Sequence, residues 1–275
     1  MVTVPDIKLV QHKLPEVSNL EYHKPGGFKI VYWGEIEGQK EAVKLVQIPE
    51  DPHDPEVKKE NLGRINREIT LLDQCKSTNL VNIGSLDVRE IEINSITYLV
   101  YSEEFIDGED LQNLIKKNYH PTRNELYELA RCLLNCIEEL SSKGAVHRDI
   151  KPANILKTDN ERGFVLIDLG LAFLMDGTDL TRNPRAVPGT DAYLAPEMFE
   201  DSFRKRLDYR ADLYNMGLTI YEYATNSHPF RSKYNRHSTF YNIRSKNAEA
   251  GLGNRPAGRL KIWDRSKLNA AVSVH

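Results

Sequence analysis

A short polar stretch at residues 147–154 carries the side chains that phosphate chemistry requires. It places a carboxylate (Asp149), an ammonium (Lys151) and a carboxamide (Asn154) on one segment, and a second carboxylate, Asp168, follows a four-residue apolar run typical of a buried strand. Phosphoryl transfer from a nucleotide needs a carboxylate to orient the attacking hydroxyl, oxygen ligands to hold magnesium, and a cation to neutralise charge. The residue types and their spacing indicate such a site.

The two segments also resemble a known family. His-Arg-Asp-Ile-Lys-Pro-Ala-Asn at 147–154 and Ile-Asp-Leu-Gly at 167–170 resemble the catalytic loop and metal-binding turn of the eukaryotic-type (Hanks-type) serine/threonine protein kinases. The resemblance implies that Asp149 is the general base, that Lys151 stabilises the transferring group, and that Asn154 and Asp168 hold magnesium. A lysine two residues after the base is the pattern of serine/threonine kinases.

The resemblance requires an ion pair upstream. The family places a lysine on the third strand, and Glu-Ala-Val-Lys supplies Lys44. The following helix supplies an acidic partner, and Arg-Glu-Ile-Thr supplies Glu68. In the family this pair positions the lysine on the α- and β-phosphates of ATP.

The glycine-rich loop departs from the family pattern. In the best register of Gly-x-Gly-x-x-Gly-x-Val, Gly26 occupies the middle glycine position, Val31 is the final valine, and lysines 24 and 29 replace the outer glycines. We expect Gly26, Gly27, Phe28 and Val31 to contact the nucleotide. The missing glycines predict a poorer approach of backbone amides to the phosphates, which the lysines could offset by charge.

The segment around residue 104 resembles the hinge that binds adenine through backbone hydrogen bonds. The resemblance implies that Glu104 and Ile106 are the hinge contacts, in a stretch about two residues longer than usual. Glu103 would then guard the back of the nucleotide pocket, which is an unusual residue for that position.

Residues 189–197 resemble the substrate-docking segment that ends in Ala-Pro-Glu. The resemblance implies docking roles for Thr190 and Glu197. It also implies candidate phosphorylation sites in the activation segment, at Thr178, Thr181, Thr190 and Tyr193. Arg148 would pair with the phosphorylated residue, and we hypothesise autophosphorylation at Thr178 or Thr181.

A third aspartate is expected to serve structure rather than chemistry. Asp212 lies in Arg-Ala-Asp-Leu-Tyr-Asn-Met-Gly, which resembles the family's central helix with a buried aspartate that anchors the catalytic loop. A buried carboxylate is costly unless backbone amides satisfy it, and the loop can supply them.

The elements that must position these groups change along the chain. Residues 28–37 and 41–47 predict a hairpin turning at Gly38, and apolar spacings at 57–75 predict a helix. Further strands are expected at 81–88 and 96–101, in a five-stranded antiparallel sheet. Residues 1–105 are therefore predicted to form a nucleotide-binding lobe with one helix.

Residues 106–275 are predicted to form a larger, mainly α-helical lobe that carries the catalytic and substrate residues. Thr122 and Glu125 offer a capping box, and an apolar stripe from Leu126 to Leu140 predicts a helix closed by Gly144. Cys132 and Cys136 on this helix are interpreted as packing residues. The fold class is α+β, with the two lobes of a protein kinase.

Composition is that of a soluble globular protein, with 40% hydrophobic and 28% charged residues. No apolar run is long enough to span a membrane, and the N-terminus has no signal-peptide core, so a cytoplasmic location is expected. Residues 231–275 carry a net charge of +8 against −11 for the rest, which together give −3. This basic end is interpreted as solvated surface or as a docking patch for an acidic partner, with nucleic acid less favoured.

The last 45 residues are fewer than the family usually carries after its Pro-Phe pair (here 229–230), so the helical lobe is predicted to be abbreviated, divergent or a fragment. The sequence thus predicts a kinase that uses ATP and Mg²⁺ to phosphorylate serine or threonine in protein substrates. Two alternatives remain: a pseudokinase acting as a binding scaffold, and a small-molecule phosphotransferase. The oligomeric state stays undetermined.

Overall fold

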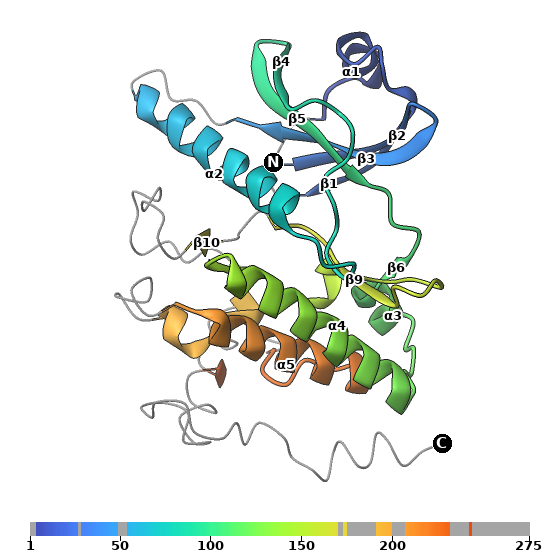
Figure 1. Ribbon diagram of the computed structural model, residues 1–275, viewed down its shortest axis with the longest axis vertical. Coiled ribbons are helices and arrows are strands. Elements are labelled where there is room, and N and C mark those ends of the chain that lie inside the picture. The colour runs from blue at the N-terminus through green and yellow to red at the C-terminus, as the bar shows by residue number, and fades with distance from the viewer. Residues whose placement is uncertain are drawn as a thin grey trace. The chain divides into compact units, whose positions relative to one another are not determined.

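The computed structural model describes residues 4–26, 29–48, 54–169, 173–174, 191–199, 207–231 and 242–243 (Figure 1). The described residues form two compact units. The first contains residues up to 76 together with 81–107, and the second contains 77–80 together with the described residues from 108 onward. The chain therefore enters the second unit for four residues before it finishes the first.

The first unit is built on a five-stranded antiparallel sheet, as the sequence predicted. Its strands follow the order β1-β2-β3-β5-β4. Their bounds are β1 (Ser18–Gly26), β2 (Lys29–Ile36), β3 (Gln39–Gln47), β4 (Arg89–Ile93) and β5 (Ile96–Glu104). Glu37 and Gly38 join β2 to β3 with φ of 51° and 80°, the left-handed pair that a two-residue hairpin of type I′ requires.

The two faces of this sheet differ in burial. Along β2, every second residue is buried, beginning at Ile30, while the residues between them remain partly exposed. The buried face forms a core with helix α1 (Ile7–Lys13), which the sequence had not predicted. Lys44 pairs with Val31 in the β2–β3 register, so it lies on the partly exposed face.

Helix α2 (Pro55–Gln74) follows β3 and matches the predicted helix closely. Asp54 caps its first turn by accepting a hydrogen bond from Glu56 N at 3.2 Å, and Pro55 stands where a proline is tolerated. Ile65 and Leu72, two of the apolar residues whose spacing predicted this helix, are buried.

The strand predicted at 81–88 is wrong. Within this segment only Ile83 forms an isolated bridge, to Glu103, and the fourth strand is β4. Side chains take the backbone donors instead: the Glu41 carboxylate accepts from Ser85 N at 3.0 Å, and Ser102 Oγ accepts from Leu86 N at 3.0 Å. Because these N–H groups bond to side chains, they do not join a strand ladder.

The absence of a side chain at Gly84 leaves room for the buried Glu41 carboxylate. A Cβ at this position would overlap Ser102 Oγ and Glu41 Oε2. We therefore expect Gly84→Ala to lower the free energy of unfolding by about 1–3 kcal/mol, measured by urea denaturation.

The matched control is Gly217→Ala, because a Cβ there meets nothing within 4 Å. This helical position is expected to keep or gain stability, by about 0.5–1 kcal/mol. A Gly84→Ala chain as stable as the unmodified chain would contradict the steric explanation.

The second unit is mainly helical. Its helices are α3 (Leu111–Lys116), α4 (Arg123–Ser142) and α5 (Tyr209–Thr225), and α4 packs beside α5 (Figure 1). Short strands form two small sheets, β6-β8-β9 and β10-β7. Their bounds are β6 (Glu109–Asp110), β7 (Ala145–Val146), β8 (Ile155–Lys157), β9 (Phe164–Leu166) and β10 (Phe173–Leu174).

Helix α4 begins and ends as predicted. Thr122 and Glu125 form the capping box, in which Glu125 N donates to Thr122 Oγ1 at 3.2 Å and Thr122 N donates to Glu125 Oε2 at 2.8 Å. Gly144 follows the helix with φ of 66°. Cys132 and Cys136 are buried, reduced thiols on its inner face, in keeping with a packing role.

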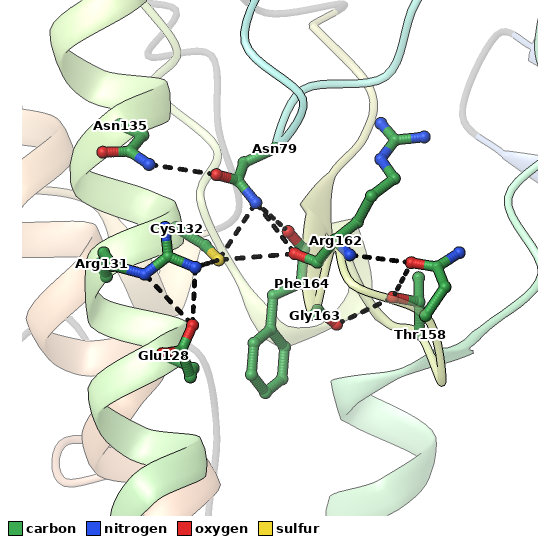
Figure 2. A network of polar contacts seen from close by, with 10 residues as sticks. Asn79, Glu128, Arg131, Cys132, Asn135, Thr158, Arg162, Gly163 and Phe164 are labelled. Carbon is green, nitrogen blue, oxygen red and sulfur yellow. Dashed lines mark hydrogen bonds and ion pairs between the residues drawn. The ribbon is translucent and has the colours of Figure 1, made fainter.

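Residues 77–80 are held in the second unit by polar contacts centred on Asn79 (Figure 2). The Asn79 carboxamide donates to Arg162 O and Phe164 O, both at 3.0 Å, and accepts from Asn135 on α4 at 3.2 Å. The Arg162 side chain donates in return to Thr78 O at 2.7 Å and Leu80 O at 3.0 Å. These contacts tie the segment to both α4 and the β8–β9 hairpin.

Candidate active site

The catalytic-loop residues lie together in the second unit. Asp149 is 6% exposed, and its Oδ2 accepts from Lys151 Nζ at 2.6 Å and from Asn154 Nδ2 at 3.1 Å. A 3₁₀ turn, Pro152–Asn154, brings Asn154 back to the aspartate, where Nδ2 also donates to Asp149 O at 3.0 Å. The ammonium and the amide therefore fix the orientation of the carboxylate.

Asp168 is brought to the same end of the β8–β9 pair as Asn154. Ile155 pairs with Leu166 in the register, and Ile167 N donates to Asn154 O at 2.9 Å just beyond the last pair. Asp168 has φ of 66°, an uncommon value for a residue with a side chain. Such backbone strain persists where the surrounding structure imposes it, and it is concentrated at functional sites.

The segment before Asp149 is anchored on helix α5. Asp212 is 1% exposed, and its two carboxylate oxygens accept from His147 N and Arg148 N, each at 2.8 Å. Arg148 has φ of 68°, so the anchor holds the loop in a strained turn. Burial raises the pKa of Asp212 to about 7, although the two amides act in the opposite direction.

His147 is fully buried beside this loop. Burial lowers the pKa of His147 to about 4, against the opposing effect of the Asp149 and Asp168 carboxylates. The unfolded chain would take up a proton near pH 6.5 while folded His147 stays neutral. The stability that depends on neutral His147 is therefore complete above about pH 6.5 and is lost as the pH falls toward 4.

Asp212 has the opposite pH dependence. The pKa of its carboxyl is 3.8 in the unfolded chain and about 7 in the folded protein. Its contribution to stability therefore falls as the pH rises from about 4 to 7. The two effects offset, and we expect the titration to be visible only residue by residue. NMR titration of the assigned His147 imidazole should show it neutral at pH 5.5. A midpoint above pH 6 would contradict the burial argument.

In the first unit, Lys44 stands on the partly exposed face of the sheet. It is 6% exposed and forms an ion pair with Glu103 of β5, which is 3% exposed. Sequence reasoning had assigned the lysine to Glu68, whose side chain lies outside the described residues, and had noted Glu103 only as an unusual residue. The pairing could not be predicted because it depends on the register of two strands far apart in sequence.

The structure describes four of the six further residues of this unit that are predicted to contact the nucleotide. Val31 is partly exposed on the same face as Lys44, and Gly26 ends β1. Glu104 ends β5, where its N–H donates to Asn82 O at 3.0 Å and its carboxylate accepts from Asn82 N at 2.9 Å. Ile106 is partly exposed just beyond. Gly27 and Phe28 lie outside the described residues.

The Ala-Pro-Glu segment packs against α5. Ala195 and Met198 belong to a buried cluster with α5 residues, and Tyr193 O accepts from Asn215. Glu197 lies in the 3₁₀ turn Pro196–Phe199. Thr178, Thr181, Thr190 and most of the basic end from residue 231 lie outside the described residues.

Sequence reasoning missed a second anchor of this segment. The Glu222 carboxylate of α5 accepts from the Tyr193 hydroxyl and pairs with Arg231 at 3.1 Å. Burial raises the pKa of Tyr193 strongly, and the neighbouring carboxylate adds to the shift. The sequence signal was Glu222 itself, an acidic residue on the inward face of α5. Its contact with Tyr193 depends on how α5 packs in the fold.

The oxygen donors of the second unit suit magnesium. Within the described ranges, no three His, Cys, Asp or Glu side chains gather as a complete metal site. Magnesium in nucleotide enzymes is held by one or two side-chain oxygens plus the substrate phosphates, so a third protein ligand is not required. Asn154 and Asp168 offer a carboxamide and a carboxylate oxygen, and this donor set fits the ion.

Over the part of the chain that the structure describes, no helix combines the length and apolar character needed to cross a membrane. The helices α2 and α4, each of 20 residues, carry charged residues along their exposed faces.

Comparison with known proteins agrees with the motifs. This chain is 31% identical to the probable serine/threonine-protein kinase PknB of Bifidobacterium longum over 62% of its length, and 30% identical to the serine/threonine-protein kinase pkn3 of Myxococcus xanthus over 62%. It is 30% identical to calcium-dependent protein kinase 5 of Plasmodium falciparum over 72%. The matches span 24%, 31% and 32% of those relatives, so this chain corresponds to less than a third of each.

The model of the protein kinase domain matches residues 26–260. That range contains the sheet face with Lys44, the Asp149 loop, Asp168 and the α5 anchor, and the described elements are those of the two-part kinase fold. The chain belongs to the protein kinase domain family.

Proposed function

We propose that this chain is a serine/threonine protein kinase that transfers the γ-phosphate of ATP in the presence of Mg²⁺. The observation that carries the proposal is the cluster of Asp149, Lys151 and Asn154 with Asp168 at the adjoining strand end. The names of the curated relatives support the same reaction class, as does Lys151 two residues after the base.

In the proposed reaction, Asp149 orients the acceptor hydroxyl and accepts its proton. The hydroxyl oxygen forms a bond to the γ-phosphorus while the bond from that phosphorus to the β–γ bridging oxygen breaks, and ADP leaves. Lys151 neutralises charge on the transferring group. Magnesium, when bound, would supply charge neutralisation at the phosphates, with Asn154 and Asp168 as its protein ligands.

Lys44 would bind the α- and β-phosphates from the sheet of the first unit. Its position opposite Val31, on the same face of the sheet, supports a nucleotide-binding role for this face. Positioning and electrostatic stabilisation then supply most of the rate acceleration, as is general for phosphoryl transfer.

The proposal includes autophosphorylation of Thr178 or Thr181 with Arg148 as the partner of the phosphate. An arginine next to the catalytic aspartate, held in a strained turn by Asp212, is a suitable docking point for such a group. The phosphate would then make a charge-assisted contact with the loop that it regulates.

The test is incubation with γ-labelled ATP and Mg²⁺ in the presence of mixed serine, threonine and tyrosine peptides. We expect label on serine and threonine, and label on the chain itself at Thr178 or Thr181, located by mass spectrometry. Inactive controls are Asp149→Asn and Asp168→Ala. Label equal in all three chains, or confined to tyrosine, would refute the proposed function.

A further inference from the structure

Both residues of the buried ion pair, Lys44 and Glu103, lie on neighbouring strands of the sheet in the first unit. In the β3–β5 register Lys44 lies opposite Tyr101 and Glu103 lies opposite Ala42, so the pair is a diagonal neighbour on one face. Lys44 Nζ lies 5.7 Å from the centroid of the Tyr101 ring, which packs beside it. Strand register alone therefore sets where the carboxylate stands relative to the ammonium.

The position along β3 places Lys44 between the end of β1 and the end of β5. On one side, Lys29 pairs with Val46 of β3 and with Gly26, the last residue of β1. On the other side, Ala42 pairs with Glu103, where β5 ends. Lys44, opposite Val31, is thus paired with a carboxylate that lies toward the end of β5.

The chemistry of the pair argues for a positioning role. A buried ion pair is weak support for stability, because desolvation of two charges offsets their attraction, yet loss of one partner leaves an uncompensated buried charge. A lysine ammonium has three donors, so a bond to Glu103 leaves others for phosphate oxygens. Glu103 can therefore hold the charged amine without consuming its binding capacity.

We propose that Glu103 is a positioning residue for nucleotide binding: from strand β5 it holds the Lys44 ammonium where the α- and β-phosphates of ATP are bound. This inference rests on the proposed kinase function. In the family pattern the carboxylate comes from the helix that follows β3, whereas Glu103 supplies one from within the sheet. Because Glu103 lies in the same sheet as Lys44, its position next to the ammonium does not depend on the position of that helix.

The test is steady-state kinetics with ATP varied at saturating peptide for the unmodified chain and Glu103→Gln. We expect the glutamine chain to raise the KM for ATP about tenfold, while the KM for the peptide stays within about twofold. A merely structural role would lower kcat through loss of folded protein and would leave the KM for ATP in place. Glu103→Asp retains the charge and is expected to recover most of the affinity.

The matched control is Glu92→Gln, the same change at an exposed position of β4 in the same sheet, which should leave both constants unchanged. If Glu103→Gln fails to fold, Glu103→Met, which replaces the carboxylate by an apolar group of similar size, is measured against the same thresholds. A KM for ATP within twofold of the unmodified chain in the folded variant would overturn the inference and leave the kinase assignment intact.

The failure of the proposed function would give a different result. In that case the unmodified chain would transfer no more phosphate than Asp149→Asn. Calorimetric titration with ATP and Mg²⁺ then decides the inference by itself: a dissociation constant raised about tenfold in Glu103→Gln supports it, and an unchanged constant or an absence of ATP binding overturns it.

Discussion

Replacing Asp149 with asparagine is expected to lower the rate of phosphoryl transfer by about 10²- to 10⁴-fold, the usual contribution of a positioned general base. Asparagine has nearly the same shape and keeps an oxygen that Lys151 can contact, but it cannot take up the hydroxyl proton. The loop should therefore keep its structure, because the bonds from Asp212 to His147 N and Arg148 N do not involve this side chain.

Single-turnover transfer from labelled ATP measures this loss directly, and ATP binding should change by less than about threefold because Asp149 acts on the acceptor. Asp159→Asn is the control, since Asp159 is exposed in the turn between β8 and β9. An Asp149→Asn chain that keeps transfer within threefold of the unmodified chain would show that another group is the base.

Replacing Asp212 with alanine is expected to affect stability as well as chemistry. Two buried N–H groups, of His147 and Arg148, would lose their acceptors, and each unsatisfied donor costs about 1–3 kcal/mol. We expect the free energy of unfolding to fall by about 2–6 kcal/mol below pH 7, with transfer reduced further because Arg148 would relax from its positive φ.

Urea denaturation together with the transfer assay separates these two effects. Asp208→Ala is the matched control on the same helix: Asp208 caps α5 by accepting from Arg210 N at 2.9 Å, and its loss should cost about 1 kcal/mol without reducing transfer in the folded protein. Equal destabilisation by the two variants would contradict the special role of the buried anchor.

Local features of this fold could be predicted from sequence. The capping box at Thr122 and Glu125 and the closing Gly144 lie within one helix, so a few neighbouring residues determine them. The hairpin at Gly38 follows from alternation and turn chemistry in the same way. The grouping of Asp149, Lys151 and Asn154 was also predictable, because six residues contain all three.

Features that depend on distant residues were not predictable. The segment 81–88 has strand-like apolar residues, but the N–H groups of Ser85 and Leu86 bond to the side chains of Glu41 and Ser102, which no local pattern indicates. The pairing of Lys44 with Glu103 required the β3–β5 register, and the contact between Tyr193 and Glu222 required α5 to pack on that segment. Helix α1, with seven residues, is too short for periodicity to reveal.

The return of residues 77–80 to the second unit has a practical consequence for dissecting the molecule. A single cut before Gly108 would produce a fragment in which Arg162 no longer bonds to the carbonyls of Thr78 and Leu80. The buried thiols of Cys132 and Cys136 on α4 would also lose their hydrogen bonds with Asn79. A separately expressed catalytic fragment should therefore need a short peptide spanning 77–80, supplied in trans or fused by a linker, to recover its native packing.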